Sequence, residues 1–293
     1  MIFKPRTISK LAITPPEPIA NRSGLAICLI VRNEARHIGE WADFHLKAGV
    51  DHFIVYDNGC SDGTIEILSK RLTSEQLTVM PWDQKLRDGR SGAELHNQVL
   101  AYAHCLRNFG GRFRWMAFID VDEFLIPTAA NSLQNALADR SNAKHISLPW
   151  HMFGRNDHET PPEGGVLANY LNRASDPLVS SHALNWKCIV DPCHVTGVRV
   201  HGFDVDGAAE GVNDVGKAAT HAARSDRSFY SRDAIQLNHY YTRSNAELQA
   251  KINRGSNKTV EAQKHIKRVM RIVDAIEKET VEDRTALEFL ARI

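Results

Sequence analysis

The chain has 293 residues, enough for one large α/β domain or two small ones, and its 43% hydrophobic and 24% charged residues argue against a disordered chain. Lysine and arginine total 36 and acidic residues total 35, so the net charge of +1 gives no general case for nucleic-acid binding. No apolar run approaches the ~20 residues of a transmembrane helix, and no secretory signal is recognisable. We therefore expect a cytoplasmic protein with reduced cysteines.

The first half of the chain alternates between predicted strands and predicted helices. Residues 1–23 hold four prolines without a clear period, so we expect a flexible N-terminal arm. Short continuous apolar runs predict buried strands, and apolar residues at helical spacing predict helices. The predicted strands are 25–31, 53–56, 77–80 and 115–119, and the predicted helices are 35–48, 64–71 and 92–106. This order is typical of a doubly wound α/β domain, in which ligands bind at the carboxyl ends of the strands.

The second half of the chain is less regular. Strands are expected at 145–150, 187–190 and 234–241. Residues 246–293 are expected to form a C-terminal helical extension. We therefore predict one α/β domain over residues 24–245.

Two carboxylates follow the predicted buried strand 115–119. Asp120 and Asp122 are two positions apart, and such positions face the same side of an extended segment while Val121 points into the core. Two close carboxylates repel each other unless a cation lies between them. Mn²⁺ or Mg²⁺ prefers oxygen ligands and completes its shell from substrate phosphates, so the pair predicts a metal site. The alternative is two solvated acids at a strand end, but the flanking apolar runs would make unpaired acids costly.

The turn at residues 57–64 is a second polar segment at a predicted strand end. Asp57 could accept a hydrogen bond from a nucleotide base or ribose. Asp62 could do the same or could cap the helix that follows, because aspartate is a favoured N-cap residue.

Three motifs together resemble those of the GT-A glycosyltransferases: LIVRNE at 29–34, DNGCSDGT at 57–64 and DVDEF at 120–124. The resemblance is to family 2 sequences and, more closely, to the family 92 branch, the eukaryotic galactosyltransferases and their bacterial relatives. It covers residues 25–255 and is strongest up to residue 127. It implies a GT-A (Rossmann-like) mixed sheet flanked by helices, with a nucleotide-sugar half at 24–127 and an acceptor half at 128–245.

The resemblance also implies roles for single residues. Asp120 and Asp122 match the pair that holds the metal and the nucleotide-sugar, and a late histidine, here His239, often completes the metal shell. Neutral imidazole is also a common ligand for such ions, although His239 could equally be a hydrogen-bonded core residue beside two tyrosines. The residues implied for the nucleotide-sugar are Arg32, Asn33, Glu34, Asp57, Asp62, Asp83 and Asp120. The cations offered for the diphosphate are Lys187, Arg243, Lys251 and Arg254, each of which could instead be a solvated surface charge.

The catalytic base is left open by the sequence. An inverting transferase needs a group that deprotonates the acceptor hydroxyl, and family 92 resembles inverting enzymes. The candidates are Asp157, Glu159 and Asp191, and His158 matches a histidine of the family in the same loop. Their spacing does not choose among them.

These features predict a metal-dependent glycosyltransferase that moves a hexose from a nucleotide diphosphate sugar, expected to be UDP-linked, to a saccharide or glycolipid hydroxyl. One alternative is a sugar nucleotidyltransferase, but such enzymes usually carry a glycine-rich phosphate loop where this chain has residues 32–36. The other is a non-catalytic nucleotide-sugar or glycan-binding protein on the same fold, which the intact acid pair disfavours. Contact with the inner face of a membrane is expected only by analogy with lipid-linked acceptors. The sequence leaves the oligomeric state open.

Overall fold

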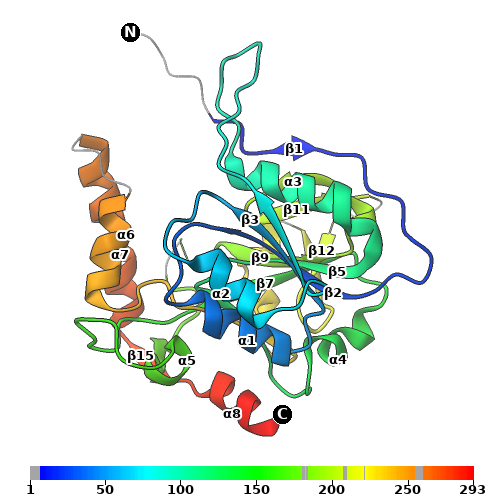
Figure 1. Ribbon diagram of the computed structural model, residues 1–293. Coiled ribbons are helices and arrows are strands. Elements are labelled where there is room, and N and C mark those ends of the chain that lie inside the picture. The colour runs from blue at the N-terminus through cyan, green and yellow to red at the C-terminus, as the bar shows by residue number, and fades with distance from the viewer. Residues whose placement is uncertain (1–6, 180–181, 183, 207–209, 221, 255–259) are drawn as a thin grey trace.

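A mixed sheet of 10 strands runs through the centre of the protein (Figure 1). The computed structural model describes residues 7–179, 182, 184–206, 210–220, 222–254 and 260–293. Across the sheet the strands are β13 (Ala218–Thr220), β12 (Glu210–Val212), β7 (His145–Met152), β9 (Trp186–Val190), β5 (Phe113–Phe118), β2 (Ser23–Val31), β3 (His52–Asp57) and β4 (Leu77–Pro81). Two more strands complete the sheet: β14 (Ile235–His239) pairs with β7 and with β6 (Glu123–Pro127).

The N-terminal part of the sheet is parallel. β2 pairs in parallel with β3 and β5, and β3 pairs in parallel with β4, so the carboxyl ends of these strands meet at one edge. β9 is antiparallel to both β5 and β7. The predicted mixed α/β fold with helices flanking a central sheet is therefore confirmed.

Successive side chains along the buried strands point to opposite faces of the sheet and pack into two separate hydrophobic cores. In β2, Leu25, Ile27 and Leu29 belong to one core, whereas Ala26 and Cys28 belong to the other. This is the alternation expected of a strand covered on both faces.

Helices cover both faces of the sheet. The first core packs against α1 (Ile38–Lys47), α2 (Thr64–Arg71), α4 (Leu133–Leu137), α7 (Val260–Glu277) and α8 (Thr285–Arg292). The second core packs against α3 (Asn97–Phe109). Two further helices are α5 (Val166–Asn169) and α6 (Asn245–Arg254). Among the described helices, none is long and apolar enough to span a bilayer.

The described part of the N-terminal arm lies against the domain. β1 (Leu11–Ala12) pairs with β10 (Val195–Arg199), which pairs with β11 (Gly202–Val205). The predicted helix over 92–106 begins only at Asn97, because the backbone at Leu95 and His96 bonds to Leu86 and Ile8 instead.

The described part of the C-terminal segment is mainly helical but includes one short strand. It contains β15 (Thr280–Glu282), which pairs with β8 (Asn172–Ala174) of the preceding domain. α8 then returns to the main body, where the ring of Phe289 lies 5.6 Å from that of Phe44. Figure 1 shows α6 and α7 side by side at the edge of the molecule, and α8 beneath the sheet.

Candidate active site

The loop after β2 and the turn after β3 are tied to each other at the sheet edge. Asp62 accepts hydrogen bonds from the backbone N–H of Ala35 at 2.9 Å and of Thr64 at 3.1 Å. Asn33, which has a positive φ of 54°, accepts from the N–H of Ser61 at 2.8 Å. Partial burial would raise the pKa of Asp62, but its hydrogen bonds from Thr64 and Ala35 outweigh this effect and lower the pKa. Together the contacts of Asp62 and Asn33 fix the loop that carries Glu34.

The acid pair does not lie on an extended strand as predicted. β5 ends at Phe118, and the chain turns so that the N–H of Glu123 donates to the carbonyl of Asp120 at 3.0 Å as β6 begins. The expectation that Asp120 and Asp122 share one side of a strand is therefore wrong. Val121 is buried as predicted, and the two carboxylates have different partners.

Asp120 is held by a buried lysine. The Nζ of Lys187, whose side chain is 1% exposed, lies 2.7 Å from Asp120 Oδ2 and 3.4 Å from Glu123 Oε2. Gln98 donates to Asp120 Oδ1 at 3.0 Å. Burial alone would lower the pKa of Lys187, but Asp120 and Glu123 raise it well above its ordinary value. Lys187 is thus a fixed internal cation beside the acid pair.

Asp122, Glu123 and His239 form the group of described residues that could hold a metal ion, with one ligand atom from each lying within 4.8 Å of the others. His239 Nε2 is 3.5 Å from Asp122 Oδ2. Burial opposes the charge of Asp122, but Lys251 and His239 outweigh it and hold the pKa of Asp122 well below its ordinary value. Burial lowers the pKa of His239, and Asp122 opposes this shift. Asp120, the other predicted ligand, is not in this group.

Two atoms of this group show that it fits a cation. Glu123 Oε1 and His239 Nδ1 are buried and have no hydrogen-bond partner among the described residues. An unsatisfied buried polar atom costs about 1–3 kcal/mol. Burial also raises the pKa of Glu123 to about 8. A hard divalent ion bound by the Glu123 carboxylate would pair its free oxygen and favour its ionised form, and His239 would offer one ring nitrogen as a ligand.

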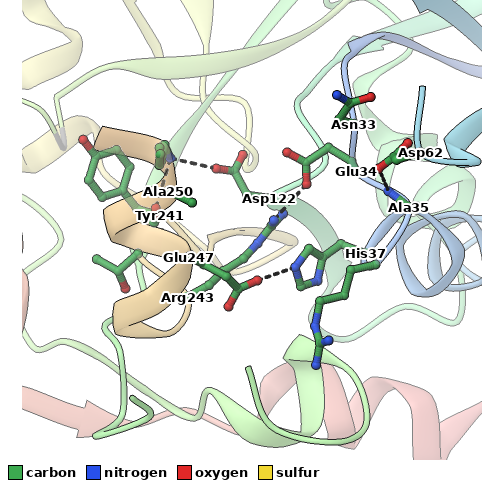
Figure 2. A pocket seen from close by; sticks show the side chains of 13 residues that line it. Asn33, Glu34, Ala35, His37, Asp62, Asp122, Tyr241, Arg243, Glu247 and Ala250 are labelled. Carbon is green, nitrogen blue, oxygen red and sulfur yellow. Dashed lines mark hydrogen bonds and ion pairs between the residues drawn. The ribbon is translucent and has the colours of Figure 1, made fainter. Parts of the chain in front are cut away.

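An open cleft with a volume of about 260 Å³ has Asp122 in its lining. Figure 2 shows it between the loop after β2 and helix α6. Arg243 bonds Glu34 across the cleft at 2.9 Å, and Lys251 Nζ lies 3.2 Å from Asp122 Oδ2. The lining residues include Asn33, Glu34, His37, Asp62, Asp122, Tyr241, Arg243, Glu247 and Lys251. The cleft therefore gathers Asn33, Glu34, Asp62, Asp122, Arg243 and Lys251 from the predicted set.

Four predicted nucleotide residues do not line this cleft: Asp120, which is paired with Lys187, and three others. Arg32 and Asp83 are exposed, and Asp57 accepts from the N–H of Cys60 at 2.7 Å in a local turn. Asp83 lies beside Gly59, so Asp57 and Asp83 share one neighbourhood at the ends of β3 and β4. The side chain of Arg254 lies outside the described residues.

The predicted base candidates are not brought to this cleft. Asp157, His158 and Glu159 line a second hollow that shares no lining residue with it. Asp191 is 3% exposed and is clamped by Arg22 at 2.6 Å and by Arg114 at 2.9 Å. This position indicates a structural role for Asp191 and not proton transfer, because both of its carboxylate oxygens are paired with arginine side chains.

Sequence reasoning missed three residues of the cleft region. Glu123 directly follows the acid pair, but its burial was not foreseeable from the motif. His37 Nε2 lies 2.6 Å from Glu247 Oε1, and Ser244 also donates to Glu247 at 2.6 Å. Burial opposes ionisation of Glu247, but His37 and Ser244 lower its pKa to about 2. The spacing of Ser244 and Glu247 is that of a capping box at the start of α6, which was the available signal.

Comparison with known proteins identifies the relatives of this chain. The family model of glycosyltransferase family 92 matches residues 24–271. A glycosyltransferase family 92 protein of Ricinus communis is 28% identical over 216 residues, which are 68% of this chain and 36% of that protein. Another from Oryza sativa subsp. japonica is 28% identical over 193 residues, which are 59% of this chain and 31% of that protein. A galactan β-1,4-galactosyltransferase of Arabidopsis thaliana is 28% identical over 117 residues, covering 39% of this chain and 22% of that protein.

The chain spans about a third of the length of the curated relatives it matches first. Among solved structures, glucosyl-3-phosphoglycerate synthase from Mycobacterium tuberculosis, in complex with Mn²⁺, UDP and glucosyl-3-phosphoglycerate, is 17% identical. The match covers 59% of this chain and 58% of that one, with a TM-score of 0.32, which is too low to carry an argument about the site. The resemblance seen in the motifs is confirmed by the family match over most of the sequence, and the chain belongs to glycosyltransferase family 92.

Proposed function

We propose that this protein is a metal-dependent glycosyltransferase that moves a hexose from a nucleotide diphosphate sugar to a saccharide hydroxyl. The observation that carries the proposal is that Asp122 belongs both to the group it forms with Glu123 and His239 and to the lining of a cleft that also holds Arg243 and Lys251. Family 92 membership supports the reaction class. The same cleft on a sugar nucleotidyltransferase would be expected beside a glycine-rich phosphate loop, and residues 32–36 contain no glycine.

Asp122, Glu123 and His239 would hold Mn²⁺ or Mg²⁺. Such an ion stabilises the negative charge that develops on a departing diphosphate. The protein's own contribution is to place the cations Arg243 and Lys251 on the same cleft, where they attract the diphosphate and lower the barrier to its departure. Lys251 also favours the ionised form of Asp122, because its positive charge lowers the pKa of the Asp122 carboxyl group.

The donor is proposed to be a UDP-hexose, with UDP-galactose as the first to test because a galactan galactosyltransferase is among the relatives. The acceptor is proposed to be a neutral β-1,4-linked galacto-oligosaccharide or a glycolipid that carries such a chain. The cytoplasmic location, with contact at the inner face of a membrane, stays a prediction.

Inversion requires a base that faces the acceptor. The carboxylates that line the cleft are Glu34, Asp62, Asp122 and Glu247. Asp62 holds the loop backbone and Asp122 belongs to the metal group, whereas Glu247, with a pKa of about 2, is a weak base. We therefore propose Glu34 as the base. Glu34→Gln keeps an oxygen for Arg243 and should lower kcat by about 10²–10⁴-fold while nucleotide binding persists.

The donor site is tested by thermal-shift titration with UDP, GDP, CDP and dTDP, each with and without Mn²⁺. A ligand that binds only the native state raises the melting temperature by mass action. We expect a Mn²⁺-dependent shift with UDP that is lost in Asp122→Ala and kept in Asp139→Ala, an exposed acid outside the cleft. Absence of a shift with every nucleotide would refute the donor site. A shift without any sugar transfer would favour the non-catalytic binding protein.

A further inference from the structure

A second hollow of about 300 Å³ lies beside the C-terminal segment. Its walls come from the loop 154–159, from β8 and β15, from the first residue of α6 and from the last residue of α7. The lining is almost entirely polar and includes Asp157, Asn172, Asn245 and Thr280. Figure 1 shows α5, β15 and α6 gathered at this side of the molecule.

The hollow is built on a fixed frame. Asn156, with a positive φ of 52°, accepts from the backbone N–H of Leu171 at 2.9 Å and of Asn172 at 2.6 Å. On the other side, the N–H of Asn245 donates to the carbonyl of His158 at 2.9 Å. The loop is therefore bonded to β8 and α6, and its polar side chains are positioned before any ligand arrives.

The charges of the hollow select the class of ligand. Arg155 is neutralised by Glu277, with Nη2 to Oε2 at 2.6 Å and Nε to Oε1 at 2.9 Å. Asp157 is exposed and has no hydrogen-bonding or charged partner among the described residues. A net negative lining repels phosphates and nucleic acids. It is also not a metal site, since the one described group of possible metal ligands lies elsewhere. Carboxylates and side-chain amides accept from and donate to hydroxyl groups, so the lining suits a neutral, hydroxyl-rich ligand.

The hollow lies next to the donor cleft, although the two cavities share no lining residue. Arg243 and Glu247 line the cleft, whereas Asn245, between them in sequence, lines the hollow. Two residues span at most about 7 Å of extended chain, so the two cavities are separated by one short segment. A chain of sugar units that enters one cavity can therefore reach the other.

We propose that this hollow binds the saccharide chain of the acceptor, beyond the sugar unit whose hydroxyl is glycosylated. The inference rests on the proposed function. It assigns the loop 154–159 to acceptor recognition and removes it from proton transfer.

The experiment compares β-1,4-galacto-oligosaccharides of increasing length with wild type and with the double variant Asn172→Ala and Thr280→Val. Neither side chain makes a hydrogen bond within the described residues, so the fold should not change. Asn142→Ala, an exposed site outside both cavities, is the control. We expect the double variant to raise KM about tenfold for the longer acceptors, as lost hydrogen bonds of about 1.4 kcal/mol in total predict, with KM for the shortest acceptor and for the donor unchanged.

Binding of a galactohexaose is also measured by saturation-transfer NMR without donor. Loss of this binding in the double variant supports the hollow even if no sugar transfer is found, which separates it from the proposed function. Transfer with the same dependence on acceptor length in wild type and double variant would overturn the inference. Equal loss for all acceptor lengths would also overturn it.

Discussion

Removal of the buried cation at Lys187 is the most direct test of how the acid cluster is stabilised. Its Nζ lies 2.7 Å from Asp120 and 3.4 Å from Glu123, so at an effective dielectric constant of about 20 the attractions are about 6 and about 5 kcal/mol before desolvation. The side chain of Asp120 is 37% exposed, so water screens its share, whereas Glu123 is 0% exposed. Breaking a buried pair by removing one partner costs about 3–5 kcal/mol, and we expect Lys187→Met to lose that much stability at pH 9.

The loss should be smaller at pH 6. Burial raises the pKa of Glu123 to about 8, so below that pH Glu123 takes up a proton and needs no counter-charge. Urea unfolding followed by tryptophan fluorescence, with EDTA present, measures both values. The matched control is Lys144→Met, which removes a half-buried lysine 3.6 Å from Asp206 and should cost less than about 1 kcal/mol. If Lys187→Met cost no more than this control at pH 9, the role of Lys187 as the internal counter-charge would be refuted.

Three further predictions concern the frame around the site. Burial lowers the pKa of His45 to about 3, below the unfolded value of about 6.5, so between these values only the unfolded state binds the proton. The free energy of unfolding should therefore fall by about 2 kcal/mol from pH 7.5 to pH 5. Urea unfolding should show a smaller fall in His45→Asn, and an equal fall would contradict the prediction. Asp191→Asn should cost about 3–5 kcal/mol by freeing its two arginines, while kcat of the remaining folded protein stays at the wild-type value; a large fall in kcat would restore Asp191 as a base candidate. Gly165→Ala would place a Cβ 1.9 Å from a carboxylate oxygen of Glu40, so it should lower the free energy of unfolding by about 1–3 kcal/mol and lower the melting temperature with it. Gly89→Ala should leave the melting temperature unchanged, because nothing lies within 4 Å of its added Cβ.

Local patterns in the sequence were sufficient for the parallel part of the fold. The run 25–31 is apolar at every position, and the structure makes it a strand buried on both faces. The predicted helix 64–71 has the bounds of α2. These predictions are confirmed because burial on both sides of a sheet and one-sided burial of a helix leave different periods in neighbouring residues, which can be read without knowing the fold.

The site was predicted only in part. Asp122, Arg243 and Lys251 do come together at the cleft, and the motif match had indicated each of them. The role of Glu123 was missed, because a glutamate after an acid pair has no signal that distinguishes a buried ligand from a surface charge. Its burial depends on β14, which pairs His239 with Glu123 across 116 residues of sequence.

The sequence by itself determined the strand and helix order, the family and the sheet edge at which polar residues gather. Only the tertiary structure decided which charges pair, such as Lys187 with Asp120 and Arg22 with Asp191. It also decided that the loop 154–159 lines a hollow separate from the donor cleft. The physical reason is distance along the chain. Secondary structure follows from contacts a few residues apart, whereas the ionisation and orientation of a buried carboxylate are set by whichever distant side chain the fold places within about 4 Å of it.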